Sequence, residues 1–119
     1  MLQVYTPPLV KTVNITVIVI VCHRQVRGLA RILTSPEAFE RMLQLMDSPH
    51  NGLTFCQGCF SSMGIDIPDA IRRVGHRAHF VHFRDVKGNA TDGFLETWQD
   101  EGQTDMKAAL EVMRQFAIV

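Results

Sequence analysis

Two short runs of β-prone residues carry side chains that could bind a metal or transfer a proton. Cys56 lies near the end of the first run, 53–58 (LTFCQG), and His82 lies within the second, 79–86 (HFVHFRDV). A thiolate and an imidazole, completed by oxygen ligands, suit a divalent metal such as zinc, iron or manganese. A buried small hydrophobe and a hydrogen-bonded histidine are the alternative, and residue types alone favour it.

Cys56 and Cys59 form a C-x-x-C pattern, which is typical of a redox dithiol or of half a zinc site. The sequence contains no second C-x-x-C and no H-x-x-x-H to complete a structural zinc site. A redox dithiol should directly precede a helix, whereas we expect a polar loop at 58–64. The redox interpretation is therefore the less favoured one.

Residues near His82 extend the candidate site. His79 and His82 differ by three positions, so in a regular strand one of them points away from the site. Arg84 shares a face with His82, where its guanidinium could bind a substrate carboxylate or pair with Asp85 or another acid. The acids within 100–105 (DEGQTD) could also reach the site, although acids before a helix are more often capping groups.

The elements that position these residues alternate along the chain. Runs rich in β-formers predict strands at 13–22, 53–56 and 79–86. Apolar residues at helical spacing predict three helices, which begin near 35, 67 and 104. The first of these has a capping-box spacing from Thr34 to Glu37. The β-α-β-α-β-α order predicts an α/β fold with parallel strands, whose carboxyl ends place Cys56 and His82 at one mouth.

Composition narrows the class of protein. A chain of 119 residues suits one domain, and its 12 basic and 12 acidic residues disfavour nucleic acid as a partner. The apolar run 13–22 is too short to span a membrane, and no membrane partner is expected. Three cysteines, an odd and sparse set, indicate reduced thiols and a cytoplasmic location.

From Arg27 to about Phe116 the chain resembles the mannonate dehydratase family of xylose-isomerase-like (β/α) barrels. The motifs that carry the resemblance are RGLARI at 27–32, SPEAFER at 35–41, LTFCQG at 53–58, HFVHFRDV at 79–86, and DEG with TDM at 100–106. The resemblance implies a partial TIM barrel of about three βα units. It also implies dehydration of D-mannonate to 2-dehydro-3-deoxy-D-gluconate in hexuronate (glucuronate) catabolism.

The resemblance further implies a Fe²⁺ or Mn²⁺ ion with four ligands, of which Cys56 and His82 are two. Arg84 becomes a candidate for binding the sugar-acid substrate, and no residue of this segment is assigned as the general base. The family's H-P-D-D-P-P motif is absent, and the chain stops before the strand that would carry the last ligand, an aspartate. We therefore expect a truncated product with impaired activity.

The expected organisation is a divergent leader at 1–26, with a strand at 13–22, followed by a barrel fragment at 27–119. Two alternatives to the dehydratase remain: a non-catalytic barrel remnant, and a small C-x-x-C module that binds metal or performs thiol chemistry. The sequence leaves open whether the chain forms oligomers.

Overall fold

The structure is a computed structural model that describes residues 16–17, 25–26 and 29–118. Its central element is a parallel sheet with the strand order β1-β4-β5, in which β1 is Thr16–Val17, β4 is Gly52–Cys56 and β5 is Ala78–His82. Every residue of β4 is buried, as expected for a middle strand covered on both faces. β1, which is the described part of the predicted strand 13–22, pairs parallel with β4, and the other residues of 13–22 lie outside the described ranges.

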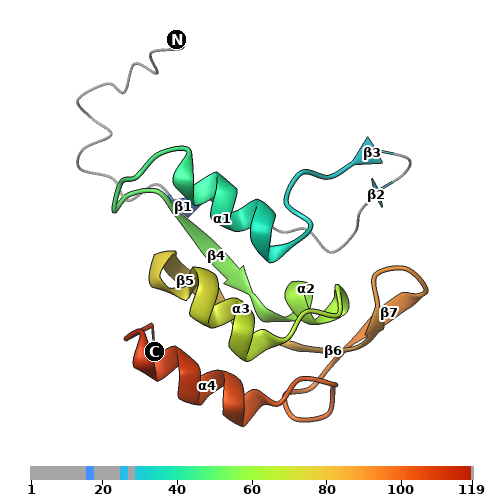
Figure 1. Cartoon of the computed structure of the whole chain (residues 1–119). Coiled ribbons are helices and arrows are strands. Elements are labelled where there is room, and N and C mark those ends of the chain that lie inside the picture. The colour runs from blue at the N-terminus through green and yellow to red at the C-terminus, as the bar shows by residue number, and fades with distance from the viewer. Residues whose placement is uncertain (1–15, 18–24, 27–28, 119) are drawn as a thin grey trace.

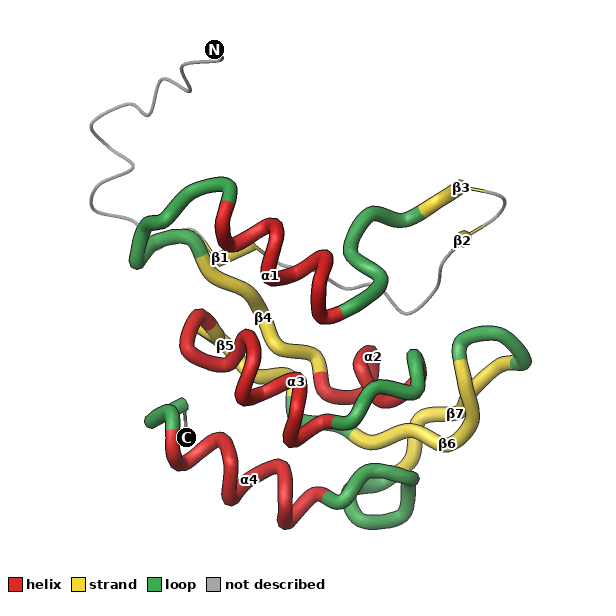
Figure 2. The backbone as a smooth tube through the Cα atoms, in the orientation of Figure 1, coloured by secondary structure: helices red, strands yellow, loops and turns green. Residues whose placement is uncertain are grey.

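Three helices form a row along the sheet, with α1 packed on α3 and α3 on α4 (Figures 1 and 2). Their bounds are Pro36–Gln44 for α1, Ile67–Val74 for α3 and Met106–Gln115 for α4. Their apolar faces meet β4 in one core, which includes Phe39, Leu53, Phe55, Ile71 and Met113. The predicted helices are therefore present.

Each of these helices begins at a side chain that accepts a hydrogen bond from a backbone N–H of the first turn. The capping residues are Ser35, Asp66 and Asp105. Ser35, and not Thr34, caps α1, so the capping box predicted from Thr34 to Glu37 is off by one residue. Asp105 confirms that an acid of the 100–105 segment has a capping role.

The loop predicted at 58–64 is wrong in its first part, because Gln57–Ser62 forms a short helix, α2. Its Phe60 ring stacks on Phe55 of β4 at a centroid distance of 4.7 Å and also lies 5.0 Å from Phe39. This burial stabilises helical structure in a segment whose glycine and serines favour a loop. The C-x-x-C pattern therefore lies directly at the start of a helix.

The third predicted strand, 79–86, is two separate strands. β5 ends at His82, and β6 (Asp85–Asn89) pairs antiparallel with β7 (Gly93–Thr97) in a hairpin where a loop was expected. The Asn89 side chain accepts hydrogen bonds from the N–H groups of Thr91 and Asp92, which closes the turn. Gly93 has a φ of +107°, a conformation that favours glycine.

Smaller elements complete the described chain. They are the antiparallel pair β2 (Gln25–Val26) and β3 (Leu29–Ala30), and the 3₁₀ turn η2 (Gly75–Arg77). The fold is thus mixed α/β, with a parallel sheet as predicted and two antiparallel pairs that were not. The described strands do not close into a barrel.

Candidate metal and thiol site

Cys56 and His82 meet at the carboxyl end of the parallel sheet. They are the last residues of the neighbouring strands β4 and β5, and they are paired in register. The Cys56 Sγ lies 3.6 Å from the His82 Nδ1. The sulfur is buried, whereas His82 is exposed, so the pair lies at the border of the core and solvent. The structure therefore brings together the two residues predicted as metal ligands.

The structure separates the two histidines of β5. His82 contacts Cys56, while His79 lies against Gly52 at the opposite end of β4, where a Cβ would overlap the His79 ring. His79 is therefore removed from the site.

Arg84 follows β5 and turns its guanidinium onto the two thiols. Its Nε lies 3.4 Å from the Cys56 Sγ, and its Nη2 lies 3.4 Å from the Cys59 Sγ. The Nη1 forms an ion pair with the Glu96 carboxylate of β7 at 2.7 Å. Arg84 thus pairs with an acid, which was one of the two predicted alternatives. The acid is Glu96 and not Asp85.

Asp85 instead binds backbone N–H groups. This fully buried carboxylate accepts hydrogen bonds from the N–H groups of Val86 and Thr104, at 2.8 and 3.2 Å. It therefore ties the start of β6 to the loop before α4, where Gly102 leaves no room for a Cβ beside the carboxylate.

The environment of Cys56 favours the thiolate. The pKa of Cys56 is lowered from 9.0 to about 5, and the main cause is a hydrogen bond from Cys59. Burial raises the pKa, but the hydrogen bond and charge of Arg84 lower it further and help to outweigh burial. Burial alone would lower the pKa of Arg84, but its hydrogen bonds to Cys56 and Cys59 raise it above the ordinary value. The sulfur and the guanidinium therefore stabilise each other as a charged pair.

Gly58 is what allows the guanidinium to lie so close to α2. A Cβ at this position would come within 2.9 Å of the Arg84 Nε. The glycine inside the C-x-x-C pattern is therefore explained by close approach of Arg84. Sequence reasoning missed this role, and it missed Glu96 because the hairpin was not predicted.

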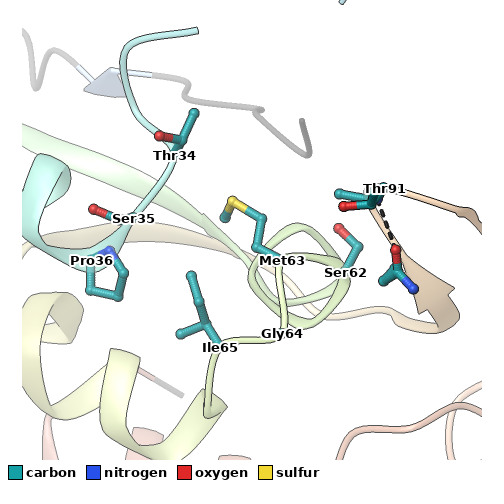
Figure 3. A pocket seen from close by; sticks show the side chains of 10 residues that line it. Thr34, Ser35, Pro36, Ser62, Met63, Gly64, Ile65 and Thr91 are labelled. Carbon is teal, nitrogen blue, oxygen red and sulfur yellow. Dashed lines mark hydrogen bonds between the residues drawn. The ribbon is translucent and has the colours of Figure 1, made fainter. Parts of the chain in front are cut away.

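A cavity within the described part of the chain lies elsewhere. It measures about 930 Å³ and is lined by residues 34–36, 62–65 and 89–91, between the start of α1, the end of α2 and the β6–β7 turn. Figure 3 shows Ser35, Ser62 and Thr91 around it. Cys56, His82 and Arg84 do not line this cavity, so it is separate from the candidate site.

Within the described residues, no group of three or more His, Cys, Asp and Glu side chains is arranged to hold a metal ion. None of the helices described is both long and apolar enough to cross a membrane. Cys56 and His82 are thus a pair of potential ligands, without a third in place among the described residues.

Known proteins similar to this chain are mannonate dehydratases. The mannonate dehydratase of Enterococcus faecalis is 40% identical over 95 residues, and that of Thermotoga maritima is 42% identical over 97 residues. Each alignment covers 75% of this chain but only 26% and 25% of the relative, respectively. The chain therefore spans about a quarter of the length of these relatives.

A solved structure agrees with these sequence matches. The crystal structure of mannonate dehydratase from Streptococcus suis serotype 2 superposes with a TM-score of 0.65 at 37% identity. The superposition covers 77% of this chain and 28% of that protein. The family model for D-mannonate dehydratase (UxuA) matches residues 21–117, which include every element from β2 to α4. This chain belongs to the D-mannonate dehydratase family.

Proposed function

We propose that this chain carries part of the metal and substrate site of an enzyme that dehydrates D-mannonate to 2-dehydro-3-deoxy-D-gluconate, a step of glucuronate catabolism. Family membership supports the reaction class, a hydro-lyase acting on a sugar acid. The observation that carries the proposal is the convergence of Cys56 and His82 at the ends of two parallel strands.

The separation of the two donor atoms fits a shared metal ion. For a tetrahedral ion such as zinc, bonds of about 2.3 Å to sulfur and about 2.1 Å to nitrogen place the donors about 3.6 Å apart. The Cys56 Sγ and His82 Nδ1 are separated by 3.6 Å. Together with oxygen ligands, a thiolate and an imidazole suit Fe²⁺ or Mn²⁺. Direct contact between the two side chains gives the same distance, and metal binding distinguishes the two arrangements.

In the proposed reaction a base removes the proton next to the substrate carboxylate, and the neighbouring hydroxyl leaves. A bound Fe²⁺ or Mn²⁺ would supply the Lewis acid that stabilises the negative charge developing in this elimination. Cys56 and His82 would hold the ion. The described residues give no assignment for the general base, and two ligands alone should hold a metal weakly.

Arg84 would bind the substrate carboxylate. Its Nη1 already binds a carboxylate, that of Glu96, at 2.7 Å, and the Glu96 side chain is 64% exposed. An exposed acid is only weakly held by an ion pair, so a substrate carboxylate could take its place. Glu96 would then return to solvent when substrate binds.

Cobalt(II) is a suitable probe for the shared ligand pair, because thiolate coordination gives a characteristic near-ultraviolet absorption band. We expect this band when Co²⁺ is added to the reduced chain, its loss in Cys56→Ser, and weaker Co²⁺ affinity in His82→Ala. His79→Ala is the matched control, since His79 lies at the other end of the strand pair. An unchanged band in Cys56→Ser, or equal affinities for His82→Ala and His79→Ala, would refute the shared site.

A further inference from the structure

Cys56 and Cys59 occupy two positions of α2 whose side chains face one another. Cys56 is the residue that precedes the helix, and Cys59 is the third residue within it. A capping box uses this same pair of positions, where each side chain reaches the backbone N–H of the other residue, and here the Cys59 side chain forms a hydrogen bond with Cys56. The two cysteines are therefore neighbours in space as well as in sequence, which the loop expected from the sequence would not have ensured.

The Arg84 guanidinium fixes the two sulfurs side by side. Its Nε and Nη2 lie on one edge of the planar group, and each is 3.4 Å from a different sulfur. A guanidinium that makes two such contacts holds its partners in parallel, as it holds the two oxygens of a carboxylate. Gly58 leaves space for this arrangement, because a Cβ there would collide with Arg84.

We propose that Cys56 and Cys59 form a dithiol site that closes to a reversible disulfide with hydrogen peroxide as the oxidant. The Cys56 sulfur attacks one peroxide oxygen, becomes a sulfenic acid and releases the first water. The Cys59 sulfur then attacks the Cys56 sulfur, forms the S–S bond and displaces the second water. Two thiols lose two electrons and two protons, and one peroxide becomes two waters. A dithiol reductant reverses the reaction.

Burial restricts which oxidants can react. The exposed fractions of Cys56 and Cys59 are 1% and 2%, so a bulky disulfide cannot approach the sulfurs in the folded chain. Hydrogen peroxide is close to water in size and can reach sites at the edge of the core. We therefore expect peroxide to oxidise the folded chain much faster than glutathione disulfide does, and both reagents to oxidise the unfolded chain.

The test uses the full chain with Cys22→Ser, so that only Cys56 and Cys59 remain, and a chelator excludes any metal. The reduced protein is treated with peroxide, denatured, alkylated and weighed by mass spectrometry. We expect a loss of two hydrogens, no alkylation of either cysteine, and full recovery of both thiols with dithiothreitol. Adding Cys59→Ser should abolish the loss of two hydrogens and leave a sulfenic acid at Cys56 that dimedone traps.

Two results would overturn the dithiol. One is oxidation of Cys56 to sulfinic or sulfonic acid while Cys59 still alkylates. The other is a folded chain that stays reduced under conditions that oxidise the unfolded chain. Because the chelator removes metal, failure here is distinct from failure of the proposed metal site, which is tested with added cobalt.

Discussion

The Cys56 sulfur is held by three side chains that come from three places in the chain. His82 reaches it from the end of β5, Arg84 from the segment after β5, and Cys59 from the first turn of α2. Each neighbour assigns the sulfur a different chemistry. The guanidinium stabilises its anion, and in our proposals the imidazole is its partner in holding a metal ion and the second thiol is its partner in forming a disulfide.

The Cys59 thiol should control the ionisation of Cys56, because its hydrogen bond is the main cause of the low pKa of about 5. Replacing Cys59 with Ala should raise the pKa of Cys56, whereas Cys59→Ser keeps a donor and should raise it less. Ultraviolet absorbance of the thiolate, followed against pH, measures both values. Equal pKa values in Cys59→Ala and the parent would contradict the assigned cause.

The same ionisation should appear in folding stability. The pKa of Cys56 is about 5 in the folded chain and has an ordinary value of 9.0. At pH values between about 5 and 9, the Cys56 thiol is protonated in the unfolded chain but ionised in the folded chain. The contribution of Cys56 to the free energy of unfolding is therefore complete above about pH 9 and is lost as the pH falls through about 5. Cys56→Ser, which does not ionise, is the reference for subtracting all other groups.

At the residue scale, sequence reasoning succeeded where strand geometry decides the outcome. Parallel strands bring their carboxyl ends together, so Cys56 and His82 were predicted to meet. Alternation predicted that either His79 or His82 would point away, and the structure shows that His79 is the one removed from the site. Cys59 and Glu96 could not be positioned in the same way, because their places depend on α2 and on the β6–β7 hairpin. Neither of those elements was predicted from the sequence.

Among the elements, α2 depends most on packing, since its own residues favour a loop. Phe60 lies between Phe39 and Phe55 and is 2% exposed. Phe60→Ala should reduce the free energy of unfolding by about 3–5 kcal/mol. Phe80→Ala is the matched control, because Phe80 is 61% exposed and its replacement should cost far less. Urea denaturation of both variants provides the comparison, and equal losses would show that α2 does not pack as described.

The start of α1 offers a second test at this scale. Ser35 Oγ accepts a hydrogen bond from the N–H of Ala38 at 3.3 Å, whereas Thr34 is one residue outside the cap. Ser35→Ala should lower the free energy of unfolding by about 1 kcal/mol. Thr34→Ala should change it by less than about 0.5 kcal/mol. A larger effect at Thr34 would restore the capping box that the sequence predicted.

The elements that sequence reasoning predicted well have strong local signals. Helix α3 has Asp66 as its cap, apolar residues at helical spacing and Gly75 at its end, and all three are observed. The β6–β7 hairpin carries its signal in Asn89 and Gly93, which were assigned to a loop because the run before them was counted with β5. The break between β5 and β6 arises where Arg84 turns to the thiols, and no local pattern marks it.

For the whole molecule, the main fact is that the chain spans about a quarter of its relatives. In the described part, β5 is an edge strand of the parallel sheet, and Phe80 on it is largely exposed. An exposed edge of this kind can pair with another strand. The described residues place two potential metal ligands together, while the resemblance of the sequence implies four.

The 119-residue chain alone should therefore show no measurable dehydration of D-mannonate with added Mn²⁺ or Fe²⁺. An incomplete set of ligands leaves the ion to water and to competing ligands. The assay follows formation of the 2-keto product, with a full-length mannonate dehydratase as positive control. Turnover that depends on metal and vanishes in Cys56→Ser would show that other residues of this chain complete the ligand set.

The most direct test of the account is a crystal structure of the reduced chain grown with excess Mn²⁺, with the ion located by its anomalous scattering. We expect a peak that lies within bonding distance of both the Cys56 Sγ and the His82 Nδ1. Co-crystals of His82→Ala should lose that peak. A manganese ion bound elsewhere, with Cys56 and His82 still in direct contact at 3.6 Å, would contradict the shared metal site.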